Sequence, residues 1–224
     1  MAFLVEVKRR TTSIMRVHYA KLQALYNSIN FDFYTWKVMF TLTKHNKKDK
    51  YLYILLGLYI ALLVYFMFFG FGRPGRIEKV QEFRYSFEFT QIPLWLPNHF
   101  TIDIIKLWIF SLGNLLAFVP FGILVPKVFE KYIKSYFQFI GLFLFFISCF
   151  EILQMVTYLG SFDVSDIVIN TMGATIGFCS YRISRRMNTP MKYFLTLGLS
   201  ILVLSVLMYF IAWVFNSTIT PYLL

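Results

Sequence analysis

The chain has 224 residues, of which 58% are hydrophobic and only 15% are charged. This composition, with a mean hydropathy of +0.62, excludes an ordinary soluble domain and is typical of a membrane protein with several spans. The formal net charge of +11 does not indicate nucleic-acid binding, because the basic residues lie between apolar runs and form no single recognition surface.

Residues 1–50 are predicted to be a basic, amphipathic N-terminal segment, cytoplasmic or at the membrane interface. They hold ten Lys or Arg against three acidic residues. Apolar side chains recur at helical spacing over residues 12–28, and a second, shorter pattern follows Asp32. Amphipathic helices lying on the inner membrane surface would fit this pattern. Helices packed against the membrane domain fit it nearly as well, and both alternatives stay open here.

Residues 51–215 are predicted to form the membrane domain of an all-α protein with about five transmembrane helices. Pro120 lies inside the second span, where it removes a backbone hydrogen bond and is expected to kink the helix, and Pro126 is expected to end it. An uncharged tail, residues 216–224, follows the last span. The five predicted spans are residues 51–71, 103–125, 136–157, 166–181 and 193–215.

The loop over residues 72–103 is the longest one and carries balanced charge. Pro93, Trp95 and Pro97 indicate a rigid aromatic piece at the membrane surface. Aromatic residues at every second position from 83 to 89 predict a short strand or hairpin.

The distribution of Lys and Arg predicts the orientation of the chain. With the N-terminus in the cytoplasm, the inner segments hold ten, three and four Lys or Arg, whereas the outer segments hold four, none and none. The positive-inside rule is then satisfied at every crossing. We therefore expect a cytoplasmic N-terminus, an outside C-terminus, and a short polar helical hairpin, spans three and four, near the outer face.

Polar side chains gather in this hairpin, where lipid would reject them. Glu151 and Gln154 share one face of span three, because they are three residues apart. Asp166, Asn170 and two glycines follow one stripe along span four. An ionisable group inside a span costs at least about 2.5 kcal/mol unless it is paired or hydrated. The hairpin is therefore the place to look for function.

Structural roles explain some of these residues. Asp163 is a candidate helix cap, and Asp166 suits the positive end of the helix dipole. Amide side chains act as interhelical hydrogen-bonding groups, worth about 0.6–2 kcal/mol each. Small residues in the G-x-x-x-G spacing allow close helix packing. The amides are Asn114, Gln154 and Asn170, and the glycines are Gly173 and Gly177.

Glu151 is the hardest residue to explain by structure alone, because its neighbours Phe150 and Ile152 are apolar. We expect Glu151, Asp166 and Asn170 to meet between spans three and four, beside Asn114 of span two. Such a pocket could hold a divalent cation at Glu151 and Asp166, grip a polar or cationic headgroup, or relay a proton. No zinc spacing, nucleophile–histidine arrangement or phosphate loop is evident, and no cofactor is predicted.

The motifs of the hairpin resemble the VanZ-like family. The resemblance rests on Glu151-x-x-Gln154, on Gly-Ser-Phe-Asp-Val-x-Asp at 160–166, on Asn170-x-x-Gly173 and on the stretch NLLAFVPFG at 114–122. It covers roughly residues 51–181. The family often has an arginine just before Gly160, whereas this chain has Leu159.

The resemblance implies a bacterial cell-membrane protein that lowers susceptibility to teicoplanin, a lipoglycopeptide-like antibiotic acting outside the cell. An outer pocket could sequester the drug's acyl chain or amine, or limit its access to a lipid-linked cell-wall precursor. Partners would be membrane lipids and one of these two molecules, with no nucleic acid. Two alternatives are a membrane enzyme on a lipid-linked or cell-surface substrate, and a small lipid or solute transporter with Glu151 as a protonation switch. The residues favour binding over catalysis.

Overall fold

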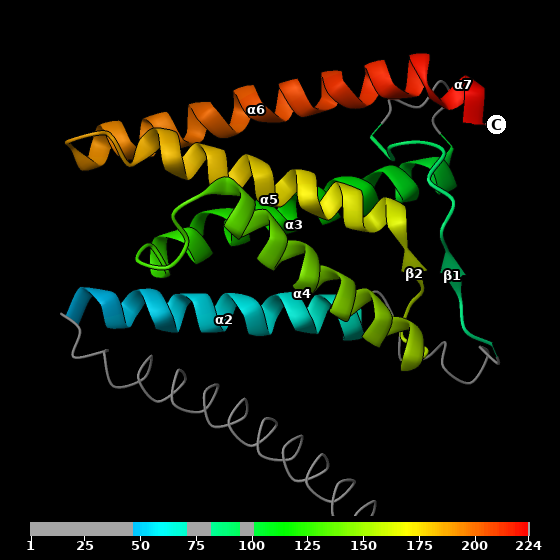
Figure 1. The fold of residues 1–224 in the computed structure, drawn as a ribbon, viewed down its shortest axis with the longest axis horizontal. Helices are drawn as coiled ribbons and strands as arrows, with labels where there is room; N and C mark the ends of the chain where they lie inside the picture. Colours follow the sequence, from blue (N-terminus) through cyan, green and yellow to red (C-terminus); the bar gives the residue numbers. More distant parts are fainter. Residues whose placement is uncertain (1–46, 71–81, 95–100, 224) are drawn as a thin grey trace, which may run out of the picture. The chain divides into compact units, whose positions relative to one another are not determined.

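The computed structural model describes residues 47–70, 82–94 and 101–223. The chain divides into two compact units, Met1–Lys50 and Tyr51–Leu224, and the second is described below by itself. The amphipathic helices predicted before residue 47, as well as Trp95 and Pro97 of the long loop, lie outside the described residues. The elements are α2 (Lys47–Phe69), β1 (Tyr85–Ser86), α3 (Ile102–Val128), α4 (Tyr136–Val156), β2 (Phe162–Asp163), α5 (Val164–Ser184), α6 (Pro190–Thr218) and α7 (Thr220–Leu223) (Figure 1).

The prediction of a helical membrane protein is confirmed. Four helices are long and apolar enough to cross a membrane, namely α2, α3, α4 and α6. The fourth predicted span corresponds to α5, which is as long as α4 but is not apolar enough to join this group. The reason is its position, because α5 packs against α3, α4 and α6 and has protein around it. A helix covered by protein tolerates polar side chains that lipid would exclude.

The helix ends follow local rules. Thr101 caps α3, and Thr189 caps α6 with a proline directly after it. Ser135 and Gln138 form a reciprocal capping box at the start of α4. Pro126 does not end the second span as predicted, since α3 continues through Pro120 and Pro126 to Val128.

Helices α3 and α5 approach each other through glycines. A side-chain atom added at Gly173 or Gly177 of α5 would collide with the main chain of α3 at Leu115 or Val119. On the α3 side, an atom added at Gly122 would lie 2.7 Å from the amide nitrogen of Phe178. The two backbones are therefore in direct contact, and α3 lies beside α5 along much of its length (Figure 1).

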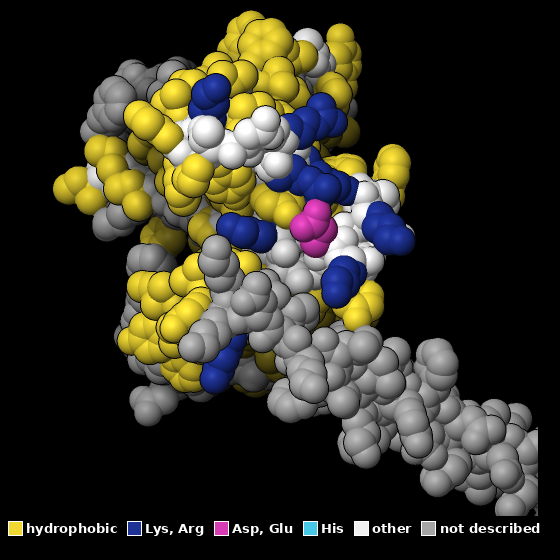
Figure 2. Space-filling view, turned by 90° about the vertical axis from the view of Figure 1, so that its left-hand side faces the viewer, with side chains coloured by type: hydrophobic (Ala, Val, Ile, Leu, Met, Phe, Trp, Pro, Cys, Tyr) yellow, Lys and Arg dark blue, Asp and Glu magenta, His cyan; other side chains and the backbone are white. Residues whose placement is uncertain are grey.

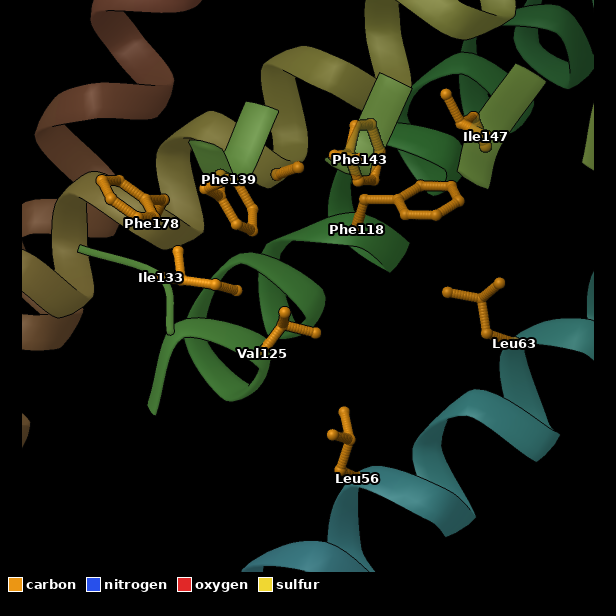
Figure 3. Close-up of a cluster of buried hydrophobic side chains, with 10 residues drawn as sticks. Leu56, Leu63, Phe118, Val125, Ile133, Phe139, Phe143, Ile147 and Phe178 are labelled. Carbon is orange, nitrogen blue, oxygen red and sulfur yellow. The ribbon is translucent and has the colours of Figure 1, made fainter. Parts of the chain in front are cut away.

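Aromatic side chains fill the space between α3, α4 and α5 (Figure 3). Phe139 of α4 stacks on Phe178 of α5 with ring centroids 4.7 Å apart, and Phe143 meets Phe118 of α3 edge-on at 5.4 Å. Leucines of α2 join the same cluster, but α2 makes few close backbone approaches to the other helices. Large rings thus bridge helices whose backbones stay apart, whereas the glycines bring α3 and α5 together.

The end of α6 holds the segment before α3 in place. Asn216 exchanges two hydrogen bonds of 2.8 Å with the main chain of Ile92. The hydroxyl of Thr220 donates to the carbonyl of Thr90 at 2.7 Å. Residues 216–223 are therefore not a free tail, because they fasten the segment 90–92 to the helices.

Candidate functional site

The turn between α4 and α5 is closed by main-chain hydrogen bonds of the Schellman type. Tyr158 has a φ of 58°, and the amide of Leu159 donates to the carbonyl of Gln154 at 3.1 Å. Glycine is the usual residue at such a position, because a side chain there costs about 1–2 kcal/mol. The ring of Tyr158 stacks on Phe83 at 5.2 Å with the planes 7° apart, which offsets part of this cost.

A small parallel sheet joins the long loop to this turn. Tyr85 is paired with Phe162 and Ser86 with Asp163, and the amide of Phe162 donates to the carbonyl of Arg84 at 3.0 Å. The alternation over 83–89 therefore does mark a short strand, β1, whose partner β2 comes directly before α5 (Figure 1). The loop and the hairpin form one structural end of the unit.

The first turn of α5 carries both candidate aspartates. Asp163 is the N-cap, with its carboxylate accepting from the amide of Ser165 at 2.8 Å. Asp166, the third residue of the helix, accepts a hydrogen bond of 3.2 Å from the side-chain amide of Asn114 on α3. The structure thus joins two candidate residues that are 52 positions apart in the sequence.

Glu151 and Gln154 lie on the buried face of α4, on the same helix as Phe139 and Phe143 of the aromatic cluster. The side chain of Glu151 is only 2% exposed. The amide of Gln154 donates to the main-chain carbonyl of Met67 on α2 at 2.9 Å. Gln154 therefore connects α4 to α2, whereas Asn114 and Asp166 connect α3 to α5.

Asn170 continues the polar stripe one turn after Asp166 and is fully buried. Among the described residues, its side-chain oxygen has no hydrogen-bond partner, and the same holds for the hydroxyl of Thr171. Buried polar atoms are normally paired. The inner part of α5 thus offers hydrogen-bonding capacity that a bound polar group or water could use.

The geometry of the described residues does not supply a complete set of ligands for the divalent cation suggested by the sequence. In the part of the chain that the structure describes, no group of three or more His, Cys, Asp or Glu side chains is arranged to hold a metal ion. The cation suggested for Glu151 and Asp166 stays a prediction.

Sequence reasoning missed the residues that hold the turn and the loop together. Tyr158 carries no turn signal, because tyrosine rarely adopts positive φ. Asn216 and Thr220 lie in a stretch without periodic pattern, and their partners are main-chain atoms about 124–130 positions away. Only the alternation around Tyr85 was a usable signal.

Four helices that are long and apolar enough to cross a membrane, packed with the more polar α5, define a multi-pass helical membrane protein. The family model of VanZ/LLP1 matches residues 56–185, which is more than half of the chain. The chain therefore belongs to the VanZ/LLP1 family, as its motifs predict. No curated protein and no solved structure matches it.

The Asn114–Asp166 hydrogen bond is expected to stabilise the contact of α3 with α5. A double-mutant cycle with Asn114→Ala and Asp166→Ala should give a coupling free energy of about 1 kcal/mol, typical of interhelical hydrogen bonds in membranes. Unfolding of the purified protein in mixed detergent measures it. A cycle that pairs Asn114→Ala with Glu88→Ala, an exposed residue of the segment 82–94, should give no coupling. Equal coupling in both cycles would contradict a specific bond.

Proposed function

We propose that this protein lowers susceptibility to teicoplanin-type glycopeptides through an outward-facing polar pocket between α3, α4 and α5. The observation that carries the proposal is the hydrogen bond between Asn114 and Asp166 at the start of α5. It brings the two family motifs together in space, at the end where β1 and β2 meet. The candidate pocket residues are Glu151, Gln154, Asp163, Asp166, Asn170 and Asn114.

The charge at the two ends of the helices supports an orientation with this pocket outside. The segments 70–101 and 157–166 hold four Lys or Arg and five acidic residues. The loops at the opposite end, 126–135 and 182–192, hold seven Lys or Arg and one glutamate. By the positive-inside rule, the basic end faces the cytoplasm. The basic segment 1–50 would then be cytoplasmic, and the domain 51–215 would lead to a C-terminus outside.

The chemistry at the outer end suits a ligand with an amine and an apolar chain. Asp166 and Glu151 would supply negative charge toward a cationic amine. Phe83, Tyr85 and Phe87 of the outer segment are exposed and form an aromatic row beside the α4–α5 turn. Such a row would contact acyl or aromatic groups that reach the membrane surface. Binding the drug there would keep it from the lipid-linked precursor.

The test is the drug susceptibility of a sensitive Gram-positive host that expresses the chain. Wild type should raise the minimal inhibitory concentration of teicoplanin and leave that of vancomycin unchanged. Glu151→Gln and Asp166→Asn should each return the teicoplanin value to that of the empty vector, because each removes a carboxylate from the pocket. Membrane levels and thermal unfolding midpoints of all variants are compared in parallel.

Glu88→Gln is the matched control, since it neutralises an exposed carboxylate on the outer segment. It should protect like wild type. A wild-type protein without any protective effect would overturn the resistance proposal for this chain. Full protection by both pocket variants would overturn the role of the carboxylates.

A further inference from the structure

A cationic surface lies at the end of the unit opposite the α4–α5 turn (Figure 1). Two loops that are about 50 positions apart in the sequence form it. Figure 2 shows these Lys and Arg side chains gathered around one acidic side chain. We call it the basic patch, and it consists of Lys127, Lys131, Lys134, Arg182, Arg185, Arg186 and Lys192.

Contacts between the two loops fix the frame of the basic patch. Arg185 forms a 2.7 Å salt bridge with Glu130, the one acidic residue of these loops. The guanidinium of Arg182 donates to the carbonyl of Lys134 and lies over the ring of Phe178. The ammonium of Lys127 lies 5.4 Å from the ring centre of Tyr193 on α6. These three cations hold the ends of α3, α4, α5 and α6 together.

The other cations are not needed for that frame. Lys131, Lys134, Arg186 and Lys192 have exposed side chains on the two loops. The one carboxylate of these loops is already bound to Arg185, so it does not neutralise them. A rigid frame thus presents several like charges within one patch. Like charges held together cost stability unless counter-charges bind.

Apolar side chains border the basic patch. This border favours an anion that also carries apolar groups. Phe137 at the start of α4 is 82% exposed, and Met191 at the start of α6 is 83% exposed. Figure 2 shows hydrophobic side chains around the cations on the same face. A nucleic acid or a soluble phosphate would gain nothing from such a border. An anionic phospholipid matches both parts, since its phosphate meets the cations and its chains meet the apolar side chains.

We propose that the basic patch binds the phosphate headgroups of anionic phospholipids and that bound lipid stabilises the membrane domain. The bound lipid neutralises Lys131, Lys134 and Arg186, while its acyl chains lie along the starts of α4 and α6. Because seven cations face one carboxylate, the basic patch has charge for more than one phosphate. This inference does not depend on the proposed function, which concerns the other end of the unit.

The experiment measures lipid binding to the purified full chain in neutral detergent. Native mass spectrometry gives the dissociation constants of phosphatidylglycerol, cardiolipin and phosphatidylcholine. The triple variant Lys131→Gln, Lys134→Gln, Arg186→Gln should bind the two anionic lipids about a hundredfold more weakly at low salt, since each basic residue near an anionic surface contributes roughly a fivefold factor. Without lipid, its unfolding midpoint should equal or exceed that of wild type, because three like charges are removed. Anionic lipid should raise that midpoint in wild type only.

Arg84→Gln is the matched control, because Arg84 is an exposed arginine at the other end of the unit. It should bind both anionic lipids like wild type. Equal binding of phosphatidylcholine and phosphatidylglycerol by wild type would overturn the proposal, as would unchanged lipid binding by the triple variant. Displacement of the lipid by inorganic phosphate or a short oligonucleotide at comparable concentration would also overturn it. The basic patch would then bind phosphate groups without any contribution from the acyl chains of a lipid.

Discussion

Replacing Gly177 with alanine is expected to lower the free energy of unfolding by about 3 kcal/mol or more, at the upper end of what overpacking costs. The added methyl group would collide with the carbonyl of Val119 and lie 2.9 Å from the α-carbon of Gly122. These are main-chain atoms of α3, so no side chain can turn away. The helices α3 and α5 must separate, and the Asn114–Asp166 bond would be strained with them. Unfolding in mixed detergent, followed by circular dichroism, measures the loss.

The same change at Gly141 is the matched control. Gly141 lies in the second turn of α4, where nothing stands within 4 Å of an added methyl group. Gly141→Ala should leave the free energy of unfolding unchanged or raise it slightly, because alanine favours the helix. Equal free energies of unfolding for Gly177→Ala and Gly141→Ala would contradict the close backbone contact between α3 and α5.

The glycine stripe on α5 shows how much of the helix packing can be predicted from the sequence. Helical periodicity puts Gly173 and Gly177 on one face of α5, and their small size indicates a close neighbour. Periodicity does not name that neighbour, because which helices meet depends on packing throughout the unit. Gly122 lies inside a family motif, yet only the structure shows that it faces Gly177.

The candidate site could be predicted in part for the same reason. Asp166 of the hairpin and Asn114 of the second span, which the sequence placed near each other, are joined by a hydrogen bond. Gln154 shares a face with Glu151 but reaches the main chain of α2, and no spacing rule reveals a partner that is a backbone carbonyl. Two polar side chains inside apolar spans can be recognised in a sequence as possible partners of each other. A main-chain carbonyl cannot, because every residue has one.

The segment 82–94 has the weakest local signal for its structure in the sequence. Its alternating aromatic residues predict a strand, but a strand of two residues takes its identity from its partner. That partner is Phe162, which lies in a turn motif that looks like a loop in the sequence. Long-range pairing of such short pieces is decided by the helices that hold both of them.

Replacing Phe139 with alanine is expected to lower the free energy of unfolding by about 3 kcal/mol, near the low end for Phe-to-Ala changes in cores. Phe139 is 0% exposed and stacks on Phe178 at 4.7 Å. Phe121 and Phe143 surround it at 6.3 and 6.4 Å. Transfer from lipid to the interior contributes little in a membrane, since lipid tails are themselves apolar. The loss therefore comes from the cavity and the missing ring contacts.

Phe145→Ala separates this packing effect from a general effect of removing a ring. Phe145 lies on the same helix and is 65% exposed, with Phe146 as a neighbouring ring at 5.8 Å. Its side chain would meet lipid, and lipid fills the space that the ring leaves, so we expect a change within about 0.5 kcal/mol. Similar losses for both variants would mean that α4 buries no preferred face. A large loss at Phe139 alone would show that ring packing joins α4 to α5 where no glycine brings their backbones together.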